Sequence, residues 1–404
     1  MTGYTYSMFG FGNDNNKQLF AALIDISSDS VGVAIVAISQ ESKLPTLLYS
    51  HRTHMRITNF DSVKSDNLRR VREALFSACL LLSQEGYLKL QSHNARGKVS
   101  KVFVTCSSPW SYTLAQNVKY ENDIRFKVNQ NIIDDLIQSA VLEISNHLKE
   151  NGLLSKEGFE TVEQVTMNMR LNDYPVAEPI GLSGTSVSLS HIVGLVPKEI
   201  SSSLQEVKEK LFRNSESRIH TYILVMFCVI QDLFKKVHSM CIINVTGEAT
   251  EFGIAENGLL IENSFVPSGY NTFTRSIMQK TGKPQSDVVT LMQAYRDGSH
   301  TSVGLLDDYI DDFSNIVADN FRKILERRVI PNEIFITVHT PHEKLFRDII
   351  ETALKKVSLP KRHLVLIDAN IINQISNGDN EDIPLSLGAR FFHTLHSYPD
   401  TTKN

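Results

Sequence analysis

The chain has 404 residues, of which 42% are hydrophobic and 21% charged, and its formal net charge at pH 7 is −4. This length predicts two domains with full cores, and the charge balance gives no electrostatic basis for binding nucleic acid. The four cysteines form no CxxC pair, which argues against a zinc site and favours a reducing cytoplasm.

The first hundred residues predict a β-hairpin followed by a helix. Residues 1–17 are expected to form a disordered leader. Apolar runs over 20–26 and 31–38 predict two strands joined by the polar turn 27–30 (SSDS), and 46–49 predict a third strand. Apolar side chains at helical spacing between Leu68 and Leu82 then predict a helix.

Residues 100–213 predict a separable block of strand, helix, strand and strand with a closing helix. The expected elements are a strand at 101–105, a helix at 133–148, strands at 162–171 and 187–196, and a helix from Lys198. A Pro/Gly-punctuated loop, 174–184, separates the last two strands. An exposed strand edge on such a block would suit pairing with another protein.

The second half repeats the strand–polar loop–strand pattern of the N-terminus. The apolar run 222–230 is too short to span a bilayer, and it predicts a helix buried on all sides. Strands around 242–243 and 252–254 flank the polar loop 244–250, and Asn257-Gly258 predicts a tight hairpin to a third strand. Residues 267–275 predict a turn leading into a helix, and 283–287 predict the start of another helix. Further elements are expected at 306–324, 334–338, 343–357, 364–367 and from Pro384, with a polar tail at 397–404.

The order of these pieces resembles the fold shared by actin, the heat-shock chaperone ATPases and the sugar kinases. Within that superfamily, the two hairpin loops and the inserted block are most similar to the FtsA/PilM branch. Residues 172–184 (NDYPVAEPIGLSG) and 266–277 (VPSGYNTFTRSI) also look like stretches of that branch. The resemblance implies an α/β, two-lobed actin-like fold, a ribonuclease-H-like duplication, with an inserted strand-helix-strand-strand subdomain.

The resemblance also implies a division of the chain into units. The expected units are the N-terminal part of the first lobe (18–99), the inserted subdomain (100–213), the rest of the first lobe (214–240) and the second lobe (241–396).

In this superfamily, the two hairpin loops clamp the phosphates of ATP, and an aspartate beside each loop orients Mg²⁺. Small residues there allow backbone N–H groups to approach phosphate oxygens. Asp25 stands where the first aspartate would be, and it is the candidate Mg²⁺ residue if a nucleotide binds. The candidate nucleotide-binding residues implied by the resemblance are Asp25, Ser27, Ser28, Ser30, Asn244, Thr246, Gly247, Thr250 and Thr340.

Several positions depart from the family pattern. The first loop has no glycine and carries an added carboxylate, Asp29, while Asn244 replaces the second aspartate and Glu248 replaces a glycine. Residues 338–340 (VHT) stand where the adenosine-binding glycines are expected. A carboxylate about 5 Å from a phosphate charge adds up to about 3 kcal/mol of repulsion at an effective dielectric constant near 20. The pattern therefore favours a pseudo-ATPase, with binding of ATP and Mg²⁺ left open.

Four other features have a functional and a structural interpretation. His339 and His342 beside Glu343 suggest a metal face that lacks a third ligand. Trp110 is expected to pack in the core, with partner anchoring as the alternative, and Cys106 has no basic neighbour that would make it reactive. An acidic cluster at the start of a long helix is expected to be a solvated face near the helix dipole: Asp307, Asp308, Asp311 and Asp312.

The preferred hypothesis is an FtsA/PilM-like cytoplasmic scaffold in type IV pilus assembly or a related envelope machine. It would bind a membrane-embedded or filament-forming protein partner through the inserted subdomain, and it would lie peripheral to the inner membrane through that partner. Self-association is left open, whereas nucleic-acid binding and direct membrane insertion are not expected. The alternatives are an FtsA-like division protein and an active small-molecule kinase or phosphatase of the same fold.

Overall fold

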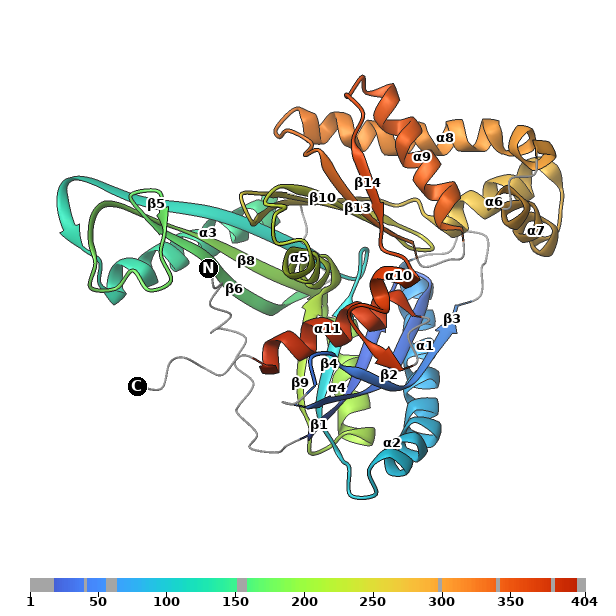
Figure 1. Ribbon diagram of the computed structural model, residues 1–404, viewed down its shortest axis with the longest axis horizontal. Helices are drawn as coiled ribbons and strands as arrows, with labels where there is room; N and C mark the ends of the chain where they lie inside the picture. The colour runs from blue at the N-terminus through green and yellow to red at the C-terminus, as the bar shows by residue number, and fades with distance from the viewer. Residues whose placement is uncertain are drawn as a thin grey trace.

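The computed structural model describes residues 18–39, 42–55, 64–150, 158–296, 300–338, 342–378 and 382–397. Within these ranges the chain forms sheets of six, five and four strands, arranged as two lobes and a projecting module (Figure 1). The predicted leader 1–17, residues 398–404 of the predicted tail, and the candidates His339 and Thr340 lie outside them. None of the described helices is both long enough and apolar enough to span a bilayer.

The first lobe is built on the six-stranded sheet, in the order β15-β3-β2-β1-β4-β9. Its strands are β1 (Gln18–Ile26), β2 (Ser30–Ser39), β3 (Thr46–His54), β4 (Val99–Cys106), β9 (Glu216–Thr221) and β15 (Asn377–Gly378). Its helices are α1 (Lys64–Leu81), the π-helical turn η1 (Leu82–Gly86), α2 (Tyr87–His93), α4 (Lys198–Leu211), α10 (Ala369–Ile372) and α11 (Ile383–Ser397).

Both faces of this sheet are covered, which explains the nearly continuous apolar sequence of β1 and β2. Phe20, Ala22 and Ile24 of β1 contribute to the core that includes α1 and α4. The alternate residues Leu19, Ala21 and Leu23 contribute to the core that includes α11 and α5 (Tyr222–Leu233).

The second lobe is built on the five-stranded sheet, in the order β12-β11-β10-β13-β14. Its strands are β10 (Met240–Val245), β11 (Thr250–Glu256), β12 (Leu259–Val266), β13 (Glu333–Val338) and β14 (His363–Leu366). Its helices are α6 (Tyr270–Thr281), α7 (Gln285–Arg296), α8 (His300–Leu325) and α9 (Glu343–Lys356). Asn257 and Gly258 both have positive φ, as the predicted tight hairpin requires.

Helix α5 shares one core with both lobe sheets. Residues 222–231 of α5 are all buried, in a cluster with Leu23 of β1 and with Ile242 of β10. The prediction of a helix buried on all sides is therefore confirmed.

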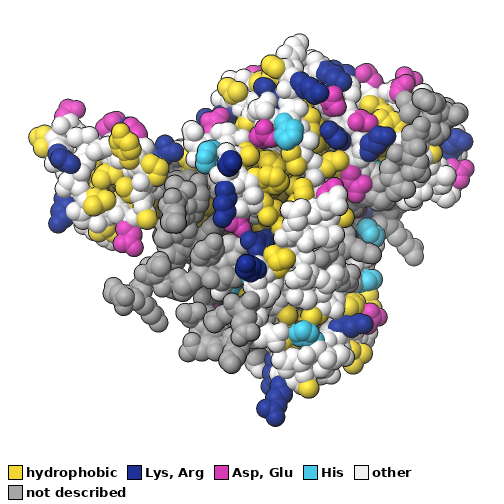
Figure 2. Space-filling view, in the orientation of Figure 1, with side chains coloured by type: hydrophobic (Ala, Val, Ile, Leu, Met, Phe, Trp, Pro, Cys, Tyr) yellow, Lys and Arg dark blue, Asp and Glu magenta, His cyan; other side chains and the backbone are white. Residues whose placement is uncertain are grey.

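The four-stranded sheet and α3 (Gln130–Glu150) form a projecting unit, residues 112–197, that we call the module (Figure 1). Its strands are β5 (Tyr112–Lys127), β6 (Phe159–Leu171), β7 (Tyr174–Pro175) and β8 (Ser183–Pro197), in the order β5-β8-β6-β7. Hydrophobic side chains gather on the surface of its outer part (Figure 2). The large exposed ones in the module's strands and loops are Tyr120, Ile124, Tyr174, Ile180 and Leu182.

Two elements predicted within the block 100–213, the strand at 101–105 and the helix from Lys198, are present but belong to the first lobe. The strand at 101–105 is part of β4, which pairs in parallel with β1 and β9 of the first lobe. Helix α4, predicted to close the block, packs into the first-lobe core with α1. The module begins instead with β5, which sequence analysis missed because its outer half is polar and charged (KYENDIRFK) and lacks apolar alternation. The described residues between 369 and 397, expected in the second lobe (241–396), also lie with the first lobe, where β15 pairs with β3 and α11 shares a core with β1. The other unit boundaries stay predictions.

Candidate functional site

The two predicted loops face each other between the lobes, as loop 1 (residues 27–29, between β1 and β2) and loop 2 (residues 246–249, between β10 and β11). The hydroxyl oxygens of Ser28 and Thr246 lie 2.7 Å apart and are buried. The backbone N–H of Glu248 donates to Ser28 Oγ at 2.8 Å, and that of Gly247 donates to Asp29 Oδ1 at 3.2 Å. The loops therefore bond directly to each other.

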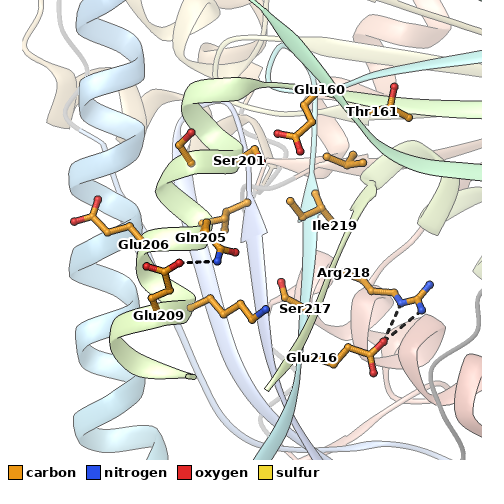
Figure 3. Close-up of a pocket in the computed structure, with 14 residues that line it drawn as sticks. Glu160, Thr161, Ser201, Gln205, Glu206, Glu209, Glu216, Ser217, Arg218 and Ile219 are labelled. Atoms are coloured by element: carbon orange, nitrogen blue, oxygen red, sulfur yellow. Dashed lines mark hydrogen bonds and ion pairs between the residues drawn. The ribbon is translucent and has the colours of Figure 1, made fainter. Parts of the chain in front are cut away.

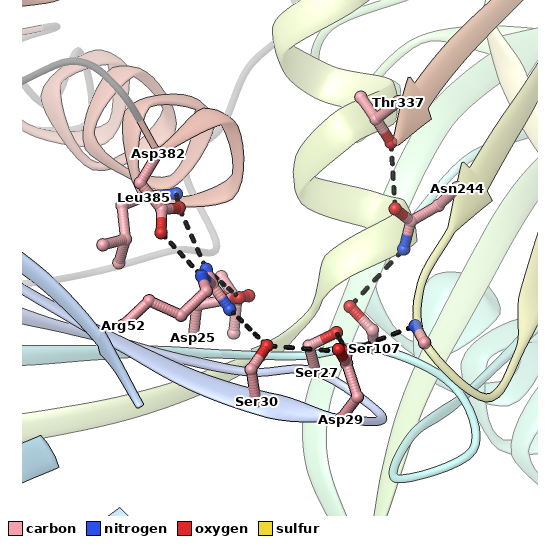
Figure 4. A network of polar contacts seen from close by, with 12 residues as sticks. Asp25, Ser27, Asp29, Ser30, Arg52, Ser107, Asn244, Thr337, Asp382 and Leu385 are labelled. Atoms are coloured by element: carbon pink, nitrogen blue, oxygen red, sulfur yellow. Dashed lines mark hydrogen bonds and ion pairs between the residues drawn. The ribbon is translucent and has the colours of Figure 1, made fainter. Parts of the chain in front are cut away.

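The Asp25 carboxylate, at the end of β1, is paired with an arginine from β3 (Figure 4). Asp25 is 1% exposed, and its Oδ2 lies 2.8 Å from Arg52 Nη2. The Thr105 hydroxyl donates to its other oxygen, Oδ1, at 2.7 Å. Both carboxylate oxygens thus have a donor from the protein itself.

Arg52 also binds a second carboxylate, that of Asp382. Its Nε and Nη2 donate to the two Asp382 oxygens at 2.6 and 2.9 Å, and its Nη1 donates to Ser30 Oγ at 3.0 Å. Asp382 precedes α11 and accepts from the backbone N–H of Leu385 at 3.0 Å, as an N-terminal cap does. The guanidinium therefore joins β1, β2 and the start of α11.

A glycine on β2 makes room for this guanidinium. A Cβ atom on Gly32 would lie 2.5 Å from Arg52 Nη2 and 2.9 Å from its Cζ. Only a residue without a side chain lets the planar group approach the strand this closely.

The charges of this cluster stabilise one another. Burial lowers the pKa of Arg52, but the Asp382 and Asp25 carboxylates outweigh burial and leave that pKa above its ordinary value. Burial raises the pKa of the Asp25 carboxyl, and the Arg52 guanidinium acts against that rise. A guanidinium between two carboxylates is a permanent cation at this position.

Asp25 does not fit the role of a Mg²⁺ residue in this arrangement. A hydrated Mg²⁺ beside the carboxylate would have to displace Arg52 or lie next to its positive charge. The metal role implied by the resemblance therefore disagrees with the geometry of the residues present.

Asn244, at the second aspartate position, is buried within a hydrogen-bond network. Its Oδ1 accepts from Thr337 Oγ1 at 2.9 Å, and its Nδ2 donates to Ser107 Oγ at 3.5 Å. Its strand neighbour Glu251 accepts from Ser108 Oγ at 3.0 Å, and burial raises the pKa of that carboxyl. Ser107 and Ser108 follow β4, so these bonds also cross from one lobe to the other.

The carboxylate of Glu248 is turned towards α6. It pairs with Arg275 through contacts of 2.8 and 2.5 Å and accepts from Asn271 Nδ2 at 3.1 Å. The repulsion expected of an added carboxylate in loop 2 is therefore offset by an arginine.

The remaining predicted site residues hold the loops in shape. Ser27 is buried, and its carbonyl accepts from Trp110 Nε1 at 2.9 Å, so core packing of Trp110 is confirmed. Thr250 is buried, and its hydroxyl donates to the Ser268 carbonyl at 2.8 Å. The structure thus brings Asp25, Ser27, Ser28 and Ser30 close to Asn244, Thr246 and Gly247, with Thr250 behind them.

Sequence analysis missed Arg52 and Thr105, which bond to Asp25, and Asp382, the second carboxylate that Arg52 binds. They come from three elements, and no local motif connects them. The only sequence signal for these partners was Arg52, on the strand next to the one that carries Gly32.

The other candidate features have structural roles. Among the described residues, no group of three His, Cys, Asp or Glu side chains could hold a metal ion. His342 is buried and stacks on Tyr270, with ring centroids 5.6 Å apart. Cys106 is buried, and burial raises the pKa of its thiol.

The four aspartates of the α8 cluster are exposed, as predicted, but they do not lie at the N-terminus of the helix. The helix begins at His300, so Asp307 lies two turns inside it, beyond the first turn where the dipole acts. Asp311 pairs with Lys356 at 2.6 Å and Asp312 with Lys280 at 2.7 Å, which makes this a surface of ion pairs.

A groove with a volume of about 870 Å³ lies where the first lobe meets the module (Figure 3). Residues of three elements line it: 160–162 of β6, side chains of α4 between Ser201 and Glu209, and 216–219 of β9. Strand β9 ends the six-stranded sheet, and no described strand pairs with its outer edge, which lies beside this groove.

Neither a family model nor a curated protein sequence matches this chain. A solved structure of the PilM–PilN type IV pilus biogenesis complex is similar, with 9% identity, coverage of 94% of this chain and 99% of that one, and a TM-score of 0.56.

The ethanolamine utilization protein EutJ from Carboxydothermus hydrogenoformans matches with 8% identity, coverage of 94% and 92%, and a TM-score of 0.45. A Bacteroides thetaiotaomicron protein with an actin-like ATPase fold matches with 10% identity, coverage of 95% and 99%, and a TM-score of 0.41. The predicted two-lobed actin-like fold is confirmed; the likeness at this identity concerns the fold alone.

Proposed function

We propose that this protein is an actin-like scaffold that binds an extended segment of a partner protein in type IV pilus assembly or a related envelope machine. The observation that carries the proposal is the free edge of β9 beside the groove. The fold shared with a chain of the PilM–PilN complex supports it. The partner would be a membrane protein tail or a filament subunit, and it would keep the scaffold at the inner membrane.

The free edge of β9 suits strand addition. The strand pairs in parallel with β4 on one side, and no described strand pairs with its other side. The backbone N–H of Thr221 donates to Glu163 of β6, away from β4, at 3.2 Å. Because backbone groups alternate along a strand, those of Ser217 and Ile219 also point away from β4. An added peptide would find donors and acceptors there.

The walls of the groove come from both the first lobe and the module. Glu160 and Thr161 of β6 lie on one side, and Ser201 and Gln205 of α4 lie on the other (Figure 3). A partner bound at this position would contact both the module and the first lobe.

The chemistry of the cleft favours a scaffold over a kinase or phosphatase. A transferase needs a carboxylate that can take a proton from the attacking group. Asp25 is tied to Arg52 and Thr105, and position 244 carries a neutral amide. An FtsA-like division protein would use the same groove but would bind a different partner.

Blocking the groove in the full-length protein tests the proposal. Ser202 is an exposed α4 residue that lines the groove, so Ser202→Trp should fill it. Ser92 is an exposed helical serine of α2 outside the groove, and Ser92→Trp is the matched control. Tagged proteins are cross-linked in native membranes, and captured proteins are quantified by mass spectrometry.

We expect a single-pass membrane protein or a filament subunit with wild type and with Ser92→Trp, and its loss with Ser202→Trp. Capture of the same proteins by all three, or of no envelope protein by wild type, would refute the groove as the binding site.

A further inference from the structure

We infer that two side chains of this chain stand in for the ligand of nucleotide-binding actin-like proteins, Arg52 for the cation beside Asp25 and Asp29 for a phosphate between the loops, and that direct bonds between the loops hold the lobes together without a ligand. This inference concerns the cleft and does not depend on which partner the groove binds.

Side chains of loop 1 occupy the position between the loops where an anion would bind. Backbone N–H groups of a small-residue hairpin form a concave site for anions. Here the Gly247 N–H donates to the Asp29 carboxylate at 3.2 Å, and the Glu248 N–H donates to Ser28 Oγ at 2.8 Å. A Cβ atom on Gly247 would lie 2.3 Å from Asp29 Cβ. A phosphate could reach these donors only after the two loops separate.

The cationic place is taken by Arg52. Its guanidinium contacts Asp25, Asp382 and Ser30 with distances between 2.6 and 3.0 Å. Unlike a bound metal ion, this cation is covalently part of the chain and does not dissociate. Its planar, forked donors match two carboxylates at once.

Two sets of direct hydrogen bonds connect the lobes. At the loops, the Ser28 hydroxyl bonds to Thr246 and to the Glu248 backbone. Behind them, Ser107 and Ser108 bond to Asn244 and Glu251. The side chains that form these bonds are buried, so water competes for them less than it does at a surface. Closure of the lobes is therefore a property of the chain itself.

Hydrogen exchange of the full-length protein tests the inference. We expect the amides of residues 246–248 to be protected without nucleotide, and millimolar Mg-ATP to change their exchange rates less than about twofold. The double variant Ser28→Ala, Asp29→Ala removes both acceptors of loop 1, and exchange at Gly247 and Glu248 should then rise about tenfold or more. Ser83→Ala, at a half-buried helical serine outside the cleft, is the control and should leave these rates unchanged.

Two outcomes would overturn the inference. One is an increase in protection of residues 246–248 by tenfold or more when wild type receives Mg-ATP. The other is a double variant that folds, by circular dichroism, but exchanges these amides at the wild-type rate. Thermal unfolding of wild type gives an independent reading: a rise in midpoint of more than about 2 °C with Mg-ATP contradicts a cleft that is already closed.

Discussion

The imidazole Nδ1 of His220 lies 2.5 Å from the Glu163 carboxylate, and this buried pair joins the first lobe to the module. His220 belongs to β9 and Glu163 to β6. The carboxylate also accepts from the backbone N–H of Thr221 at 3.2 Å, and the imidazole stacks on Phe103 with ring centroids 4.9 Å apart. The pair lies next to the groove, so it sets the position of one wall.

Replacing this histidine should destabilise the protein. His220→Ala leaves the Glu163 carboxylate buried without its main partner, and we expect a loss of about 3 kcal/mol in the free energy of unfolding. Glu163→Gln keeps a hydrogen-bonding group of the same size and should lose less. Urea unfolding measures both, and equal losses in the two variants would contradict the pairing.

Removing the charge of Arg52 should lower the free energy of unfolding more than replacing its forked guanidinium with the single ammonium group of lysine. Arg52→Met leaves Asp25 and Asp382 as buried, unpaired carboxylates, and we expect a loss of about 3–5 kcal/mol in the free energy of unfolding. Arg52→Lys keeps the charge and should lose about half as much. In the Arg52→Met background, Asp25→Asn should recover part of the loss, because it removes one unpaired charge. A loss below about 1 kcal/mol for Arg52→Met would show that the cluster contributes little.

Glu251 predicts a pH dependence of stability. Burial raises the pKa of its carboxyl, so the folded protein binds this proton more tightly than the unfolded chain does. Its contribution to stability is therefore fully present below the unfolded pKa of about 4.3 and is lost as the pH rises through the higher folded pKa.

Glu251→Gln should remove this loss of stability with rising pH. We expect the variant to be more stable than wild type at about pH 8, with the difference disappearing near pH 4, as measured by urea unfolding across this range. A difference between variant and wild type that does not change with pH would contradict the assignment to Glu251.

Gly247 should tolerate no side chain. A Cβ atom there would lie 2.3 Å from Asp29 Cβ and 2.6 Å from Asn271 Nδ2, so Gly247→Ala should force the loops apart and lower the free energy of unfolding by about 1–3 kcal/mol. Gly304→Ala is the matched control, because the exposed glycine of α8 has nothing within 4 Å of its added Cβ. That control should gain about 0.5–1 kcal/mol from helix propensity. Equal effects at the two positions would contradict the loop contact.

Local patterns predicted most of the elements. The apolar runs of β1, β2 and β10, the Asn257-Gly258 turn and the helical spacing of α8 are all properties of short segments. They follow from backbone geometry and from the need to bury one face, and both act over a few residues. Strand β5 escaped prediction because it is long, largely exposed and charged in its outer half.

The candidate site was predicted only in part, because local sequence patterns do not reveal contacts between distant segments. The turn composition of loops 1 and 2 identified which segments would meet, and Asp29 and Glu248 already stood out as added carboxylates. Their partners, Gly247 across the cleft and Arg275 on α6, come from other parts of the fold.

The sequence by itself determined the actin-like order of elements and the added carboxylates of loops 1 and 2, because both are properties of neighbouring residues. Only the tertiary structure decided the partners of Asp25, since a guanidinium from β3 reaches Asp25 and Asp382 across 27 and 330 residues of chain. Electrostatic attraction acts through space, and folding brings together charges that no local pattern connects.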